Sequence, residues 1–370
     1  MLIKQLRLNS FRNFAELEIE PSASLNLIRG SNGAGKSSLL ESIYVMGYGR
    51  SFRTSRANSL IQFDKQEASV FCKLGHDKSV EEYKIGCSRH RKDGFSYRIN
   101  GQSASSLAEL VKHLPVQLFT PQSSDVILGS PLLRRKFLDW ALFHVELSFV
   151  SLSSQYTKLL AHRNALLRKM AKSALRMPSD EGNELSYWTL ELASRGEIIS
   201  QIRQDYLSLL SDKASVLIRQ FLPEFQLELR YNKGWDASLS LLEALTAKQQ
   251  RELMLGYTDA GPHKADVRII VNEELAADTL SRGQLRVLMS SLQIAQIQLL
   301  KEKAAIQTIY MIDDISAELD DTMKARFLAL AAEANSQIFV TAIEKQQLTF
   351  TNDYNDKKMF HVEHNQVNEE

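Results

Sequence analysis

Residues 28–47, IRGSNGAGKSSLLESIYVMG, carry side chains whose types and spacing suit the binding of a phosphorylated ligand. Part of this segment has the spacing G-x-x-x-x-G-K-S, the pattern of loops that surround the phosphates of a nucleotide. Glycines let backbone N–H groups turn toward an anion, Lys36 adds a positive charge near the outer phosphates, and the Ser37 hydroxyl suits Mg²⁺. The residues predicted to bind nucleotide here are Gly30, Ser31, Asn32, Gly33, Ala34, Gly35, Lys36, Ser37 and Ser38. We therefore expect a nucleoside triphosphate and Mg²⁺ as ligands.

Two adjacent acids, Asp313 and Asp314, follow the apolar stretch TIYMI. An acid at the carboxyl end of a buried parallel strand lies where ligands gather in α/β proteins. Asp313 is predicted to hold Mg²⁺ through water, because Mg²⁺ keeps several of its own waters. Asp314 is the predicted catalytic residue that orients or deprotonates the attacking water, with Lys36 as the second catalytic residue. The alternative is a pair of acids that caps a turn before the next helix.

A third motif, LSRGQ at residues 280–284, is predicted to open a helix. Ser281 is a natural N-cap, and Gly283 lets a phosphate approach the end of the helix. Together with Gln284, these residues are predicted nucleotide contacts. The order of phosphate loop, L-S-x-G-Q, acidic strand and the turn SAELD resembles the order found in ABC-type ATPases.

The resemblance to ABC-type ATPases implies two further site residues. Thr341 ends an apolar strand at the place where that family has a γ-phosphate sensor, commonly His, so its role is open. Gln122 follows the strand-like PVQLFT and is the expected glutamine on the metal side, with Gln117 as the alternative.

The elements that must position these motifs change along the chain. The first third alternates apolar and polar residues as half-buried strands do, with a tight turn at Asn100 and Gly101 and a possible capping box from Ser106 to Glu109. From residue 130 to about 221, glycine is scarce and apolar residues recur at helical spacing, interrupted by a predicted turn at PSDEGN. The last third alternates strands and helices, which predicts a parallel sheet. The tail VEHNQVNEE is expected to be frayed.

The predicted fold class is α/β: an ABC-type P-loop ATPase head that is split by an inserted helical arm. The predicted domains are the N-terminal part of the head (residues 1–125), the helical arm (residues 126–225) and the C-terminal part of the head (residues 226–370).

Composition limits the function only weakly. The 370 residues include 45 Lys and Arg against 44 Asp and Glu, for a net charge of +1, so a nucleic-acid surface must be a local patch. Cys72 and Cys87 have no metal-ligand spacing and are expected to be reduced, packed thiols. No apolar run reaches transmembrane length, so we expect a cytoplasmic protein without a membrane partner, bound to the nucleoid when it binds DNA.

Three basic clusters are candidates for a DNA surface. Arg50, Arg53 and Arg56 are spaced by three and would share one face of a helical turn, where they could reach phosphates. Arg134 and Arg135 belong to a second cluster, and a third lies near residues 163–169. The alternative for each cluster is a solvated face or packing within the arm.

Several motifs together resemble the bacterial RecF family. They are LRLNSFRNF, GYGRSFRT, GSPLLRRKFLDW, GPHKAD, DTLSRGQL and IDDISAELDD. The resemblance implies an ABC-type head like that of SMC proteins and ATP-dependent DNA binding in recombinational repair, replication restart and the SOS response. It further implies weak DNA-dependent ATPase activity, an ATP-dependent homodimer, RecR and RecO as partners, and recombinase loading on single-stranded and gapped duplex DNA.

Three alternatives stay open. The ATPase subunit of an ABC transporter shares the main motifs, but it usually has Glu where this chain has Asp314, and it has no use for the basic loop GRSFRT. A structural chromosome ATPase of the SMC type is disfavoured, because the predicted arm is far too short for the coiled coil of that class. The sequence HKAD at residues 263–266 differs by one residue from the guanine-binding motif N-K-x-D, but His lacks the amide of Asn, so we favour ATP over GTP.

Overall fold

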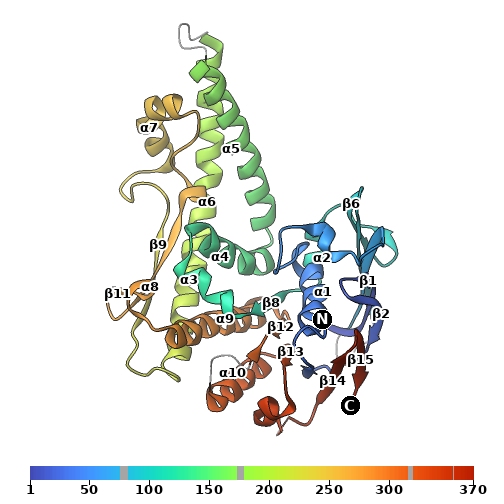
Figure 1. Cartoon of the computed structure of the whole chain (residues 1–370). Helices are drawn as coiled ribbons and strands as arrows, with labels where there is room; N and C mark the ends of the chain where they lie inside the picture. The colour runs from blue at the N-terminus through green and yellow to red at the C-terminus, as the bar shows by residue number, and fades with distance from the viewer. Residues whose placement is uncertain (76–81, 173–178, 316–319, 353) are drawn as a thin grey trace. The chain divides into compact units, whose positions relative to one another are not determined.

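The computed structural model divides into two compact units, which we treat separately (Figure 1). One comprises residues 1–124 with 282–370, and the other comprises residues 125–281. The insertion thus begins beside the predicted boundary, but residues 226–281, predicted to belong to the head, lie in the inserted unit. The structure describes residues 1–75, 82–172, 179–315, 320–352 and 354–370.

A largely parallel sheet forms the centre of the first unit. Its middle strands are apolar and buried along their length, as expected for a sheet covered on both faces. The last two strands pair in antiparallel orientation and include six of the nine tail residues predicted to be frayed, so that prediction is wrong. In spatial order the strands are β15 (Gln366–Glu369), β14 (Lys357–Glu363), β3 (Leu25–Arg29), β13 (Gln337–Ala342), β12 (Ile309–Ile312) and β8 (Val116–Phe119).

A second, antiparallel sheet has the predicted alternation of buried and exposed residues. The turn at Asn100 and Gly101 is confirmed: both residues have positive φ, 49° and 83°, and the flanking strands pair across them. The strands are β2 (Phe14–Ile19), β1 (Leu2–Phe11), β4 (Glu67–Gly75), β5 (Glu82–His90), β6 (Gly94–Ile99) and β7 (Gln102–Ser103).

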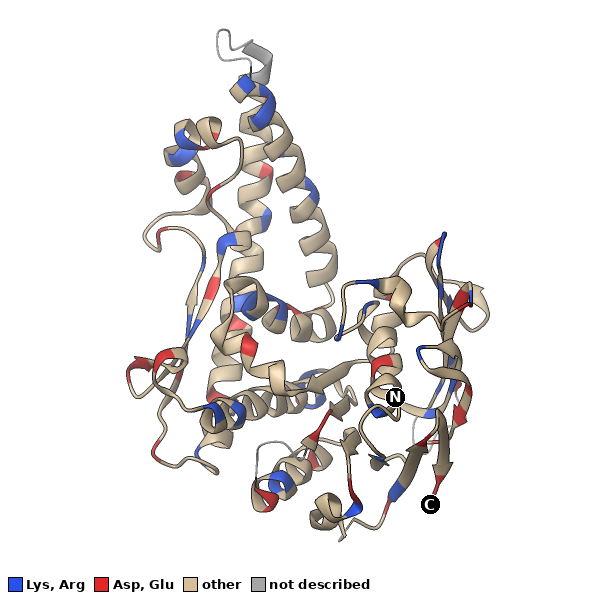
Figure 2. Cartoon of the chain, viewed as in Figure 1, with Lys and Arg blue, Asp and Glu red and all other residues tan. Residues whose placement is uncertain are grey.

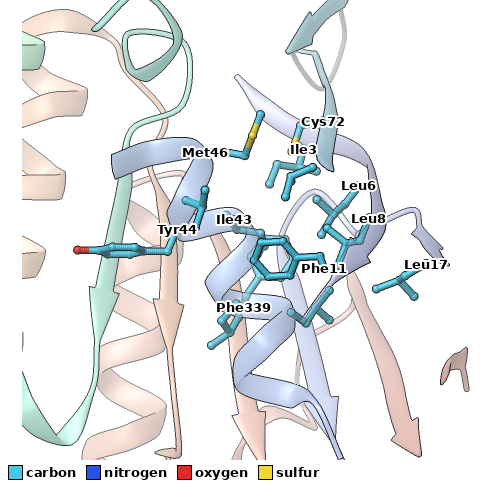
Figure 3. Close-up of a cluster of buried hydrophobic side chains, with 14 of the residues drawn as sticks. Ile3, Leu6, Leu8, Phe11, Leu17, Ile43, Tyr44, Met46, Cys72 and Phe339 are labelled. Atoms are coloured by element: carbon cyan, nitrogen blue, oxygen red, sulfur yellow. The ribbon is translucent and has the colours of Figure 1, made fainter. Parts of the chain in front are cut away.

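Helix α1 (Lys36–Tyr48) is buried between the two sheets. Its residues from Ser38 to Gly47 are all buried, and Ile43 and Met46 belong to a cluster with Leu6 of β1 and Phe339 of β13 (Figure 3). A helix buried on every side is held firmly by its neighbours. Cys72 and Cys87 are free and buried, as predicted, and burial raises the pKa of the Cys87 thiol to about 12.

The opposite face of the parallel sheet is covered by helices, whose apolar residues form a second core with β3, β12 and β13. The predicted capping box is wrong, because the Glu109 carboxylate accepts from Ser105, not from Ser106. The remaining helices of this unit are η1 (Ala57–Leu60), α2 (Leu107–Val111), η2 (Pro121–Ser124), α9 (Arg282–Ala304), α10 (Asp321–Glu333) and η5 (Lys345–Thr351).

The inserted unit is a helical arm with a small sheet at its side, in which β10 lies between β11 and β9 (Figure 1). Residues 179–183, predicted as a turn, belong to α6; Pro178 lies outside the described residues. Its elements are α3 (Asp125–Leu128), α4 (Pro131–Val145), α5 (Phe149–Lys172), α6 (Ser179–Ile218), β9 (Leu227–Asn232), α7 (Leu241–Leu255), η3 (Pro262–Lys264), β10 (Asp266–Val271), β11 (Glu274–Leu275) and α8 (Ala276–Thr279).

No helix in the described part of the chain is both long and apolar enough to span a membrane. Lys and Arg lie among Asp and Glu on both units (Figure 2).

Candidate nucleotide site

The predicted motifs of the first unit meet at the carboxyl edge of the parallel sheet. The phosphate loop follows β3, Thr341 lies near the end of β13, Asp313 follows β12, and Gln122 follows β8. The backbone N–H of Asp313 donates to the Phe119 carbonyl of β8 at 2.9 Å, which holds these strand ends together. Because parallel strands all end at the same edge, segments far apart in sequence form one site.

The phosphate loop has no room for side chains at two of its glycines. A Cβ at Gly30 would lie 2.2 Å from the Val362 carbonyl oxygen. Gly35 has φ 120°, and a Cβ there would lie 2.6 Å from the Asn13 amide nitrogen. The helix α1 begins at the next residue, so its first N–H groups face the loop. This cradle fits a chain of phosphates.

Lys36 lies inside this loop. Its Nζ donates to the carbonyl oxygens of Gly30 and Ser31 at 2.7 and 3.0 Å. Burial lowers the pKa of Lys36, whereas the charges of Asp313 and Asp314 act in the opposite direction. A cation held by backbone carbonyls at the helix start is placed to contact the outer phosphates of a nucleotide.

The acid pair is fixed by Thr341, a fully buried residue. The Thr341 hydroxyl donates to Asp313 at 2.8 Å and accepts from the backbone N–H of Asp314, also at 2.8 Å. Asp314 has φ 58°, a left-handed conformation that is uncommon for residues other than glycine. The hydrogen bonds show how Thr341 acts: it holds the two acids in place.

The residues that would hold Mg²⁺ lie together. The Ser37 hydroxyl donates to the Asp313 carboxylate at 3.1 Å, so a hydroxyl and a carboxylate, both hard oxygen ligands, meet beside the phosphate loop. This donor set fits Mg²⁺. Gln117 is 4% exposed and donates to Gln296 inside the protein, so it is not free for a metal. Gln122 is exposed and remains the candidate on the metal side.

A cavity of about 760 Å³ opens over the phosphate loop and is unexpectedly basic. Besides Lys36 and Ser37 it is lined by several arginines, together with the exposed ring of Phe63. These arginines are Arg12, Arg53, Arg56 and Arg91. Arg53 and Arg56 belong to the first predicted basic cluster, whereas the sequence interpretation missed Arg91. The basic run RHRK at residues 89–92 is the signal that could have identified Arg91.

The segment with Arg50, Arg53 and Arg56 is not helical, so the expectation of a shared helical face is wrong. Arg53 and Arg56 nevertheless line the same cavity. Arg50 lies beside Tyr44; burial raises the pKa of that phenol, and the Arg50 charge opposes the rise. The structure therefore separates Arg50 from the other two.

The second basic cluster serves the arm itself. Arg134 forms a two-pronged ion pair with Asp266, at 2.7 and 3.1 Å, and also donates to the Gly129 carbonyl. Arg135 donates to the Ala265 carbonyl at 2.6 Å. Because these guanidinium groups have internal acceptors, we do not retain Arg134 and Arg135 as DNA contacts. They are packing within the arm, the alternative left open by the sequence.

Only Arg163 of the third cluster is interpreted in the same way, because Arg168 and Lys169 are exposed. Arg163 is fully buried and pairs with the equally buried Glu252 at 2.7 Å. It also donates to the Thr258 hydroxyl at 2.7 Å. His263, from the HKAD sequence, bonds Tyr156 at 2.8 Å within the inserted unit. The contact with Tyr156 gives His263 a structural role in the arm and does not support a guanine site.

The LSRGQ motif lies at the start of α9, which begins at Arg282, immediately after Ser281. A Cβ at Gly283 would meet no described atom within 4 Å, so the surface at this helix start is open. An open helix N-terminus can accept an anion from outside. That arrangement is compatible with the predicted nucleotide contacts of Ser281, Gly283 and Gln284.

Comparison with known proteins shows which family the chain resembles. The family model described as RecF/RecN/SMC N terminal domain matches residues 2–368. The chain is 43% identical over 370 residues to the DNA replication and repair protein RecF of Pseudoalteromonas atlantica, covering 100% of both chains. It is 38% identical over 367 residues to the corresponding protein of Shewanella denitrificans, covering 99% of each.

Two solved structures show the fold. The structure described as the recombination mediator protein RecF-ATP in the RecFOR pathway has a TM-score of 0.88 and 27% identity, covering 100% of this chain and 97% of that chain. An SMC head domain from Pyrococcus furiosus, solved with the C-terminal domain of ScpA, has a TM-score of 0.58 and 18% identity, covering 100% of this chain and 96% of that one. The second likeness concerns the fold alone: an ABC-type ATPase head.

Proposed function

The chain belongs to the bacterial RecF family of DNA replication and repair proteins, and from this premise we propose that it is a DNA-binding protein controlled by ATP. The observation that carries the proposal is one basic cavity, in which Arg53 and Arg56 lie beside Lys36. Nucleotide and DNA phosphates would then be bound by neighbouring parts of the same surface.

ATP with Mg²⁺ is the proposed ligand of the phosphate loop. Lys36 would contact the outer phosphates, while Ser37 and Asp313 would hold the metal, which neutralises phosphate charge when it is bound. Ser281, Gly283 and Gln284 would contact the nucleotide of a second copy. The ATP named for a 27% identical solved relative supports ATP over GTP.

Asp314 is the proposed residue for hydrolysis. Its carboxylate would orient the attacking water and accept its proton as the water oxygen bonds to the γ-phosphorus and the bond from that phosphorus to the oxygen of the leaving ADP breaks. Aspartate is one methylene shorter than glutamate, so we expect slow turnover, which suits a switch better than a motor.

The proposed DNA surface consists of Arg53 and Arg56. Arg91 lines the same cavity, but its guanidinium already donates to the Lys65 carbonyl at 2.7 Å. Contacts from arginine to phosphate carry little sequence information, so binding should depend on DNA form and salt more than on sequence. Gapped duplex and single-stranded DNA are the proposed substrates, by membership of the family. An ATP-dependent homodimer, assembly with RecR and RecO, and help in loading recombinase complete the proposal.

The ATPase subunit of a transporter is the alternative from another class. Binding to gapped duplex, single-stranded and duplex DNA, each with and without ATP, separates the two. We expect ATP to strengthen DNA binding, most for gapped DNA, and added salt to weaken it. A protein that binds ATP tightly and none of the DNAs at low salt would contradict the proposal.

A further inference from the structure

Glu41 is a charged side chain in the middle of a buried helix. It lies in α1 between apolar neighbours such as Leu40 and Ile43, and its exposed fraction is 0%. Burying a carboxylate is unfavourable unless strong partners compensate the lost hydration. The contacts of Glu41 therefore indicate what this residue is for.

The first partner of Glu41 is Arg12, in the turn between β1 and β2. The Arg12 guanidinium donates Nε–H and Nη2–H to the two carboxylate oxygens at 2.7 and 2.6 Å. Its third nitrogen donates to the Ser59 carbonyl at 2.8 Å. Arg12 has φ 55°, a left-handed conformation that this fork of hydrogen bonds helps to hold.

The second partner is Ser51, in the basic loop. Its hydroxyl donates to Glu41 and accepts from the backbone N–H groups of Arg53 and Thr54, at 2.9 and 3.0 Å. The Arg53 guanidinium, 48% exposed, lies 4.0 Å from the same carboxylate and also lines the cavity. One hydroxyl thus connects the buried acid to the backbone of the loop.

We propose that Glu41 is a positioning residue that couples nucleotide binding to DNA binding, through Arg12 and through the hydroxyl of Ser51. Glu41 follows Lys36 by five positions on the same helix, which is about 7.5 Å along the axis at about 1.5 Å per residue. A helix packed on every side moves as one body, so a shift of its N-terminus on binding triphosphate reaches Glu41. The Glu41–Ser51 contact then moves the loop that carries Arg53 and Arg56. This inference rests on the proposed function, since it concerns the regulation of the same site.

The test compares Ser51→Ala with Ser51→Thr. The first variant removes the hydroxyl that bridges Glu41 and the loop, and the second keeps it. Neither changes Glu41, Arg12 or any arginine of the cavity. For each protein we would measure the dissociation constant for gapped DNA with and without ATP by fluorescence anisotropy, and the dissociation constant for ATP by calorimetry. The coupling factor is the ratio of the two DNA constants.

We expect Ser51→Ala to reduce the coupling factor to about one, while its ATP affinity and its DNA affinity without ATP stay within about twofold of the parent. Ser51→Thr should retain the parental factor. Glu41→Gln should also lose coupling; if it does not fold, the serine pair still decides the matter. A purely structural role would lower the melting temperature without changing the ratio.

Two failures are distinguishable. If the parental protein binds DNA equally with and without ATP, the ATP control in the proposed function is wrong, and the coupling role of Glu41 is wrong with it. If the parental protein is coupled and Ser51→Ala keeps the same factor, only the inference about Glu41 is overturned.

Discussion

At the scale of single residues, the site depends on hydrogen bonds between side chains from distant parts of the chain. Asp313 accepts from both Ser37 and Thr341, which ties the acid to the phosphate loop on one side and to β13 on the other. Asp314 is held with positive φ by the same threonine. Strained residues of this kind persist only where the surroundings fix them, and they cluster at functional sites.

Lys36→Ala removes the charge that faces the outer phosphates and leaves the glycine backbone unchanged. Hydrogen bonds to charged groups contribute about 1.5–3 kcal/mol, so we expect ATP affinity to fall by about 10- to 100-fold and hydrolysis to disappear. Titration calorimetry and phosphate release measure both. Lys303→Ala, at an exposed position late in α9, is the matched control. Unchanged turnover in folded Lys36→Ala would contradict the assignment.

Asp314→Asn keeps the size of the side chain and removes its ability to accept a proton. We expect ATP binding to be retained and hydrolysis to fall by about 10²- to 10⁴-fold, the usual contribution of general base catalysis. Single-turnover hydrolysis measures the effect, and Asp212→Asn, at an exposed position of α6, is the control. A parental rate in Asp314→Asn would show that another group activates the water.

At the scale of elements, the basic loop and the arm use arginine in opposite ways. In the loop, Arg53 and Arg56 line an open cavity. In the arm, Arg134 and Arg163 are bound to carboxylates of the same unit. The difference lies in how closely each guanidinium is bound: Arg53 is 48% exposed and 4.0 Å from Glu41, whereas Arg134 and Arg163 contact their acids at 2.7 Å. Spacing in the sequence does not reveal this.

Changing Arg53 and Arg56 to Ala should weaken DNA binding and reduce its salt dependence. Each phosphate contact contributes about −0.9 to the slope of log affinity against log salt, so the double variant should flatten this slope by about two. ATP affinity should change less than DNA affinity. Replacing Arg134 and Arg135 in the same way is the control, and an equal flattening there would contradict the assignment of the surface.

Lowering the pH should reduce the folding stability of the arm, because His263 becomes protonated. Burial, with the charges of Lys264 and Arg135, lowers the pKa of His263 to about 4, although the Thr258 carbonyl acts against this. The unfolded pKa is about 6.5, so the unfolded state binds more protons between these values, and stability is lost as pH falls from about 6.5 to 4. At pH 5 the expected loss is about 2 kcal/mol.

Urea unfolding at pH 7 and pH 5 measures this effect. In His263→Gln the loss of stability between the two pH values should be smaller by about 2 kcal/mol. His364→Gln, at a side chain that is 89% exposed, should behave like the parent. An identical loss in His263→Gln and parent would show that another group carries the pH dependence.

At the scale of the whole molecule, the open start of α9 points to a second copy of the chain. A γ-phosphate held by one phosphate loop would gain N–H partners from the LSRGQ helix of the other copy, so two ATP molecules would join two identical heads. ADP lacks that phosphate and should not hold the dimer. The proposed switch is therefore a change in association.

Ser281→Arg places a bulky side chain without an acceptor at this helix start. We expect the parental protein to be dimeric with ATP and monomeric with ADP in sedimentation experiments, and the variant to be monomeric with both. Ser238→Arg, at an exposed serine of the inserted unit, should behave like the parent. A parental protein that is equally dimeric with ATP and with ADP would contradict this proposal.

The sequence by itself was enough to locate the phosphate loop and the acid pair. Both depend on residues close together in the chain: Gly30 to Ser37 on a bare backbone before a helix, and Asp313 directly after an apolar strand. Local spacing and local conformation are enough for such motifs. The order of the motifs was enough to predict a split ATPase head.

Only the tertiary structure decided which ionic groups meet. In the sequence, nothing distinguishes Glu41 from other polar residues of a helix. Its partners Arg12 and Ser51 come from two other segments of the chain. Arg134 finds its acid 132 positions away, on β10. The tail forms a strand because β14 offers a free edge. A buried charge pairs with the opposite charge that the tertiary fold places next to it. Long-range packing, not local spacing in the sequence, therefore determines the partner.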